Sequence, residues 1–456
     1  MILAGQSPRP ERLPRLTETE SDATAAIAAA IAAADYRTNG APFEPFIIKA
    51  AEEEDFTPIW TSQRGIPGIA FYRYKGARND GFLPLGDYAR VEDAPRRMPI
   101  LLLKPMPGHE DALAHPTSFF WLLDDYKSGN DRDLTYFGMV APDGYMPVGI
   151  AVTNGELPRA EDYWCVNVNY LSEADLEPFW SDSGSHWSHD GSLSAPVTKQ
   201  GEGGGKLLIA PTTMLSDERI RDVGGRKDAF ALRVEKLFLD VPGSAPVRPA
   251  YSDGASEGSR TPMGIHKVAV VPCNAVHDIW VGLQPADCPF YYVAGHPLWT
   301  CLGAYRGQKA GTFSHTFTIG SSTSSSKEFA QTTSLTVSAD VGIEAGKDGG
   351  RSAHMSTSYT EEMSIRTSTT ATHATETSDE VRLDMPEAER VLLWQRVMRF
   401  TTYRTNRRGD PRISEVASVD YMTHESDITA SPDAGSGFAA EPRPDLIEVI
   451  PLPTAG

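Results

Sequence analysis

Between residues 335 and 345 every odd-numbered residue is apolar, and every even-numbered residue is polar or glycine. After a Gly-rich stretch, the alternation resumes over residues 353–360. Because side chains alternate across a β-strand, each arm has one apolar face and one polar face. A membrane-spanning β-strand needs about 9–11 tilted residues with this alternation. The pattern therefore predicts an amphipathic β-hairpin that is long enough to cross a bilayer.

The two faces of this hairpin are expected to meet different surroundings. The face expected to contact lipid consists of Leu335, Val337, Ala339, Val341, Ile343, Ala345, Ala353, Met355 and Tyr359. The face expected to line a pore lumen includes Asp340, Glu344 and His354. A three-residue turn at Asp348, Gly349 and Gly350 pairs odd residues with odd residues and keeps the apolar face continuous, whereas a two-residue turn would not. The alternative is a surface hairpin on a soluble β-sandwich, which alternates identically.

Long Ser/Thr-rich segments flank the hairpin at residues 321–334 and 364–378. They can form strands but are too polar to fill a normal core. A mucin-like or disordered linker is the alternative, but these flanks lack proline and bracket an ordered pattern. Such strands around an amphipathic hairpin resemble the pore-forming module of the aerolysin-like (ETX/MTX2) toxins. Segments 287–299 and 393–404 resemble its bordering strands, so the resemblance covers roughly residues 285–430 and implies an elongated antiparallel β domain.

The first two-thirds of the chain contain an internal repeat. Trp60, Trp121 and Trp180 recur about every 60 residues, and the segment 80–86 closely matches the segment 143–149. Each repeat is one supersecondary unit that buries its face against its neighbours. Short strands with Gly/Pro turns in three copies predict three small sheets around a pseudo-threefold axis. We expect a β-prism-like domain whose shared core contains the three tryptophans.

These motifs resemble the Vps62 (DUF946-type) family over about residues 42–275, which implies an architecture more than an activity. β-Prism modules often bind glycans at their loop ends. Two loops rich in Asp, Ser and Gly lie between the repeat motifs. The candidate ligand-binding residues in these loops are Asp124, Asp131, Asp133, Asp182 and His186.

Candidate chemistry is sparse. His186 and His189 lack a third metal ligand at fixed spacing, so a surface loop is the preferred interpretation. The loop that begins at Asp124 has Thr135 where an EF-hand requires a bidentate Glu. The chain contains no Walker loop, G-x-S-x-G elbow or H-E-x-x-H motif. We therefore expect no metal, no cofactor and no enzymatic activity.

Composition narrows the partners further. The net charge of −19 argues against nucleic acid binding and against general attraction to anionic lipid. Cys165, Cys273, Cys288 and Cys301 share no CxxC spacing, which favours buried thiols, with one or two disulfides as the alternative. The sequence contains no apolar run of about 18 residues, so we expect no transmembrane helix. The Ala-rich segment 25–34 follows acidic residues, so we expect a short helix rather than a signal peptide, and release by a non-classical route.

The sequence thus predicts a mostly β protein. Four parts are expected: an extension with a short helix (1–40), a β-prism-like head (41–283), an aerolysin-like domain (284–430) and a Pro/Gly-rich tail (431–456). The predicted function is that of a soluble pore-forming toxin, with insects as a candidate target, that binds a surface glycan or protein on the target-cell membrane and assembles as a homo-oligomer. The alternative is a non-lytic carbohydrate- or membrane-associated binding protein; a hydrolase ranks third.

Overall fold

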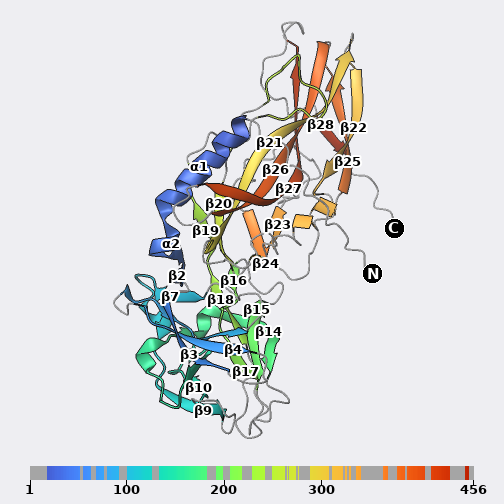
Figure 1. The fold of residues 1–456 in the computed structure, drawn as a ribbon. Coiled ribbons are helices and arrows are strands. Elements are labelled where there is room, and N and C mark those ends of the chain that lie inside the picture. Colours follow the sequence, from blue (N-terminus) through green and yellow to red (C-terminus); the bar gives the residue numbers. More distant parts are fainter. Residues whose placement is uncertain are drawn as a thin grey trace, which may run out of the picture.

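The structure is a computed structural model, and it confirms the mostly β prediction (Figure 1). It describes residues 18–51, 55–62, 68–76, 80–91, 100–125, 133–181, 192–198, 206–217, 229–241, 249–261, 264, 267–273, 276, 288–307, 311–321, 324–325, 328–329, 335–339, 363–367, 377–385, 388–405, 412–431 and 447–450. The molecule is elongated, with a head of short strands at one end and a body of long strands at the other. Helix α1 (Glu18–Ala34) lies along the side of the long sheet, and α2 (Tyr36–Asn39) follows it toward the head.

The head is built around three antiparallel meanders, one for each sequence repeat. The first contains β3 (Phe56–Thr61), β4 (Ile69–Tyr74) and β6 (Tyr88–Val91). The second contains β9 (Ser118–Asp124), β10 (Thr135–Val140) and β12 (Ile150–Thr153). The third contains β14 (Leu171–Ser181), β15 (Ser192–Thr198) and β17 (Leu215–Asp217), and its sheet continues into β18 (Ala229–Val234) and β16 (Leu207–Ile209). The predicted three-repeat organisation therefore has a direct counterpart in the strand order.

Two smaller sheets complete the head. One has the order β1-β2-β7-β5, from β1 (Ala41–Phe43), β2 (Phe46–Ala50), β7 (Leu101–Pro105) and β5 (Leu83–Pro84). The other has the order β11-β13-β8, from β11 (Tyr145–Met146), β13 (Cys165–Asn167) and β8 (Leu113–Ala114). Short 3₁₀ turns occupy Glu110–Ala112, Ala160–Asp162 and Val168–Tyr170.

The three repeat tryptophans differ in burial. Trp60 and Trp180 are buried in a core formed by all three meanders, as expected. Trp121 is 41% exposed, so the expectation that it fills this core is wrong. In β3 and β14 the β-bulge lies just before the tryptophan, whereas in β9 the register shifts after it, between Trp121 and Leu123. A bulge changes which residues face inward, and in β9 Leu122 and Leu123 are the buried residues.

The repeated Pro-x-Gly motif brings two chain segments into direct backbone contact. A Cβ atom on Gly86 would lie 2.9 Å from the carbonyl oxygen of Ile150, and one on Gly149 would lie 2.6 Å from that of Leu85. Only glycine allows this approach. Thr213 lies beside Gly149, and its hydroxyl donates to the carbonyl oxygen of Val148. The matching glycines of the first two repeats therefore allow the backbones of these repeats to pack directly against each other.

The body consists mainly of long antiparallel strands. One sheet has the order β19-β20-β21-β26-β27, from β19 (Leu237–Leu239), β20 (Lys267–Pro272), β21 (Phe290–Gly307), β26 (Ala388–Thr405) and β27 (Ile413–Ala430). Another has the order β22-β25-β28, from β22 (Gly311–Ile319), β25 (Thr377–Met385) and β28 (Ile447–Ile450). A separate pair contains β23 (Leu335–Ala339) and β24 (Met363–Thr367). Because β19 and β20 pair into this first sheet, the body's sheet begins upstream of the boundary expected at residues 283 and 284.

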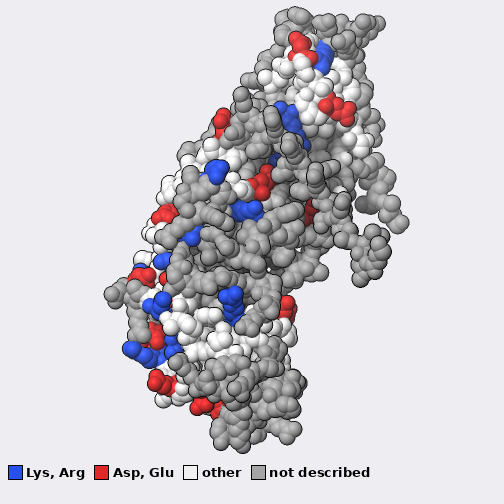
Figure 2. Space-filling view, viewed as in Figure 1, with Lys and Arg blue, Asp and Glu red and all other residues white. Residues whose placement is uncertain are grey.

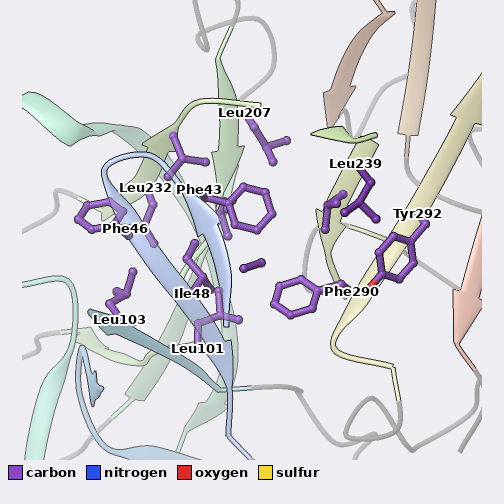
Figure 3. Packing of buried hydrophobic residues seen from close by; sticks show 14 of the residues in the cluster. Phe43, Phe46, Ile48, Leu101, Leu103, Leu207, Leu232, Leu239, Phe290 and Tyr292 are labelled. Atoms are coloured by element: carbon purple, nitrogen blue, oxygen red, sulfur yellow. The ribbon is translucent and has the colours of Figure 1, made fainter. Parts of the chain in front are cut away.

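One continuous hydrophobic core joins the head to the body. Phe290 at the start of β21 packs against Phe43 of the head, with ring centroids 6.2 Å apart, and against Tyr36 at 6.3 Å. Figure 3 shows Phe290 between the cluster around Phe43 and the side chains of Leu239 and Tyr292. Ile27 and Ile31 of α1 belong to the same cluster. The helix therefore seals the junction from the side.

All four cysteines are buried thiols, in agreement with the preferred interpretation of their spacing. Within the described part of the chain, no helix is both long and apolar enough to span a membrane.

Candidate functional site

The base of the predicted hairpin is an antiparallel ladder of β23 and β24. Val337 pairs with Ile365 and Ala339 pairs with Met363, whereas Ser338 pairs with Ser364. Directly opposed residues of an antiparallel pair share one face of the ladder. Odd-numbered positions of both arms therefore share one face, and even-numbered positions share the other. This is the parity that the alternating sequence requires for a continuous apolar face.

The register of this ladder differs from that of a regular hairpin closed at residues 348–350. Such a turn would place Leu335 opposite residue 363, but Leu335 pairs with Thr367, four positions further along. Of the hairpin residues predicted to face lipid, Leu335, Val337 and Ala339 lie in β23. The other predicted lipid-facing residues, the lumen-facing residues and the turn residues lie outside the described residues; they are Val341, Ile343, Ala345, Ala353, Met355, Tyr359, Asp340, Glu344, His354, Asp348, Gly349 and Gly350. Their faces and the turn remain predictions.

The long sheet of the body meets strand β22 of the β22-β25-β28 sheet at a buried glutamine. Gln395 of β26 is 1% exposed, and its Nε2 donates to the carbonyl oxygens of Thr318 at 2.7 Å and Thr423 at 2.9 Å. A buried amide without partners would be costly, so these bonds fix where β22 crosses the long sheet. A bridge between Gly320 and Met422 lies at the same place. The sequence alone shows Gln395 only as a polar residue in an apolar strand.

An ion-pair cluster links neighbouring strands of the long sheet. Arg399 of β26 lies directly opposite Asp420 of β27, with Nε 2.7 Å from Oδ1. Arg260 contacts the other carboxylate oxygen, with Nη2 3.0 Å from Oδ2. Burial alone would raise the pKa of Asp420, but the two arginines outweigh it and hold the pKa below its ordinary value. The carboxylate is therefore charged over the whole neutral range.

The head contains a buried charge network that sequence reasoning missed. Asp87 is 2% exposed and accepts hydrogen bonds from Arg73 (Nη2–Oδ2, 3.1 Å), from the backbone N–H of Val152 (2.7 Å) and from the hydroxyl of Tyr163 (2.9 Å). Arg73 also donates to the carbonyl oxygen of Val152. Burial raises the pKa of Asp87, and its three donors oppose that shift. Burial alone would lower the pKa of Arg73, but Asp87 raises it above the ordinary value, so the guanidinium stays charged.

The predicted ligand-binding loops are only partly described. Asp124 is half-buried at the end of β9, opposite Thr135, and Asp133 is exposed. Asp131, Asp182 and His186 lie outside the described residues. Asp125, which the sequence did not single out, is 2% exposed and accepts a 2.6 Å hydrogen bond from the backbone N–H of Leu134. It closes the β9–β10 hairpin from inside, so this carboxylate is structural.

The described surface offers no single-sign patch on the face shown in Figure 2, where Lys and Arg alternate with Asp and Glu over head and body. An exposed aromatic edge is present on β9, where Phe120 is 39% and Trp121 is 41% exposed. Phe120 lies across Gly138 of β10, where a Cβ atom would be 2.2 Å from its ring. Among the described residues, no group of three His, Cys, Asp or Glu side chains is placed to hold a metal ion.

Comparison with known families and structures bears mainly on the head. The family model for vacuolar protein sorting-associated protein 62 (Vps62) matches residues 47–192. GNIP1Aa from Chromobacterium piscinae is similar with 16% identity and a TM-score of 0.35, over 50% of this chain and 43% of GNIP1Aa, so the chain spans less than half of that protein. Cry35Ab1 is similar with 12% identity and a TM-score of 0.29, over 70% of this chain and 89% of Cry35Ab1.

The comparison with curated proteins gave no match. The match of the Vps62 family model confirms the Vps62 resemblance expected from the repeat motifs over residues 47–192.

Proposed function

We propose that this protein is a soluble β-pore-forming toxin. The carrying observation is the register of β23 and β24, which pairs odd residues with odd residues at the base of an alternating hairpin. The alternation continues through residues 340–345 and 353–360, so the apolar face has the length that a membrane-spanning strand needs. The described base of this hairpin lies beside the head, where β24 contacts β16.

Insertion of such a hairpin requires an oligomer. A single hairpin in lipid would leave unpaired backbone groups along both of its edges, and the hydrocarbon cannot satisfy them. Hairpins from several copies of the chain can pair edge to edge and close into a barrel. The proposed active form is therefore a homo-oligomeric ring in the target-cell membrane.

The head would supply the choice of target. A net charge of −19 and the interspersed surface charges give no basis for general attraction to anionic lipid (Figure 2). Recognition would instead use a specific glycan or protein receptor, and the loops that contain Asp131 and His186 are the predicted contact regions. The continuous core at Phe43 and Phe290 couples the head to the body.

Dye release from liposomes made of target-cell membranes tests this proposal. Insect midgut and red-cell membranes are the first sources, and the expected result is release together with rings in electron micrographs. Binding without release would overturn pore formation and leave the alternative of a non-lytic carbohydrate- or membrane-associated protein. One observation favours that alternative: β24 contacts β16 of the head, so the described base of the hairpin already has a packing partner in the folded protein.

A further inference from the structure

A polar cleft in the head has no role in the pore-forming proposal. Its volume is about 440 Å³, within the range of about 300–1,000 Å³ typical of ligand sites. Its polar lining is provided by Thr57, Arg73, Tyr74, Lys75, Asn154 and Asp162. These residues come from the paired ends of β3 and β4, from the segment after β12 and from the 3₁₀ turn at 160–162.

Two residues that line this cleft, Arg73 and Tyr74, are fixed by contacts with neighbouring residues. Arg73 is fixed by the fully buried carboxylate of Asp87 and by the carbonyl oxygen of Val152, so its guanidinium has little freedom. The ring of Tyr74 packs edge-on against Phe56 at 5.9 Å. Gly76 lies so close that a Cβ atom there would be 2.0 Å from the Tyr74 hydroxyl oxygen. Preorganised walls of this kind reduce the entropy cost of binding.

The charges around the cleft exclude a strongly anionic ligand. Arg73 and Lys75 line it, but Asp162 lies beside them and Asp87 already neutralises Arg73. Burial, together with the negative charges of Asp80 and Asp55, raises the pKa of Tyr74 to about 12, so its hydroxyl remains a neutral donor and acceptor at physiological pH.

The lining also has apolar surface, because Ile59 and Leu83 contribute to it. A ligand that matches both properties carries many hydroxyl groups and no net charge, and has C–H faces that can rest on aliphatic carbon.

We propose that this cleft binds a neutral saccharide. The inference rests on the proposed receptor-binding role of the head, and it places a sugar site at the β3–β4 end rather than only in the loops between repeats. Thr57 and Asn154 would exchange hydrogen bonds with sugar hydroxyls, and Arg73 would donate to one of them from its fixed position. Ile59 and Leu83 would contact the less polar face of the ring.

Saturation-transfer NMR on the full chain tests the site. The probes are glucose, galactose, mannose, N-acetylglucosamine, lactose and maltose, with N-acetylneuraminic acid and inorganic phosphate as anionic probes. Thr57→Ala and Asn154→Ala each remove a polar group from an exposed position, so the fold should survive. Asn169→Ala is the matched control, since Asn169 is also exposed but does not line the cleft. We expect a neutral sugar to bind the wild type and Asn169→Ala equally, and about tenfold more weakly to either cleft variant.

Three outcomes would overturn the proposal: no neutral sugar binds, a neutral sugar binds equally to all variants, or an anionic probe binds in preference. Dye release measured on the same proteins separates this inference from the proposed function. Sugar binding that depends on Asn154, without dye release from any target membrane, would support the cleft and refute the pore. Dye release with no sugar bound in the cleft would do the reverse.

Discussion

At the scale of single residues, the repeat tryptophans make different contributions although the sequence presents them alike. Trp180 is 5% exposed in the core shared by the three meanders, whereas Trp121 is 41% exposed on the edge strand β9. Trp180→Ala should lower the free energy of unfolding by about 3–5 kcal/mol, because it leaves a large cavity. Trp121→Ala should cost less than about 1 kcal/mol. Chemical denaturation of both variants measures the difference, and equal losses would contradict the shifted bulge in β9.

A second residue-scale prediction concerns the pH dependence of stability. The folded pKa of Asp420 is lowered, so its ion pairs contribute stability above pH about 4, the ordinary pKa of Asp, and lose it as the pH falls through the lower folded value. Asp420→Asn should therefore unfold more easily than the wild type at pH 7, by roughly 1–2 kcal/mol. The difference between the two proteins should shrink as the pH falls below about 4.

Urea denaturation at pH 7 and pH 3 measures both differences. Glu415→Gln is the matched control, because Glu415 is an exposed carboxylate on the same strand. A pH-independent difference between Asp420→Asn and the wild type would mean that the carboxylate is not stabilised by its charge.

At the scale of elements, the hairpin separates the membrane interpretation from the soluble one. If Val341 reaches the bilayer midplane, Val341→Arg should cost roughly 2–4 kcal/mol per subunit in the inserted state. Repeated around a ring, this cost should abolish dye release while folding and cell binding persist. Ser338→Arg is the control, because Ser338 pairs with Ser364 on the polar face of the ladder, and it should be far milder. Wild-type dye release by a folded, cell-binding Val341→Arg protein would refute insertion of this hairpin.

The elements also show where sequence reasoning ends. Alternation predicted β23 and its parity, because side-chain period is a local property of the chain. It did not predict the pairing of Leu335 with Thr367, since register depends on the residues between the arms. Likewise the repeat predicted three meanders, but the bulge in β9 depends on how Leu122 and Leu123 pack against the other two sheets.

At the scale of the whole molecule, the head and body were expected as separate domains, yet they share a core. Phe290 and Phe43 are 247 positions apart in the sequence, and no local pattern links them. β20 pairs with β21 across the boundary expected at residues 283 and 284, with Pro272 opposite Phe290, whereas the sequence placed β20 in the head. Asp87 escaped notice because a carboxylate after glycine is typical of a turn, and its burial comes from Arg73, Val152 and Tyr163 meeting in three dimensions.

The assembled pore should be mildly cation-selective. Each subunit is expected to place Asp340 and Glu344 on the lumen face, and rings of carboxylates attract cations. Arg366 pairs with Thr336, an even-numbered position at the base of the hairpin, so we expect it to bring an opposing charge to this face.

Arg366→Gln should therefore strengthen cation selectivity, and Asp340→Asn combined with Glu344→Gln should remove or reverse it. Reversal potentials in a salt gradient across planar bilayers measure these changes. Ser338→Asn, a neutral change on the same face, is the control and should leave the potential unchanged. If the wild-type channel is anion-selective and substitutions at Asp340, Glu344 and Arg366 leave its selectivity unchanged, the odd-numbered face lines the lumen instead of the even-numbered face.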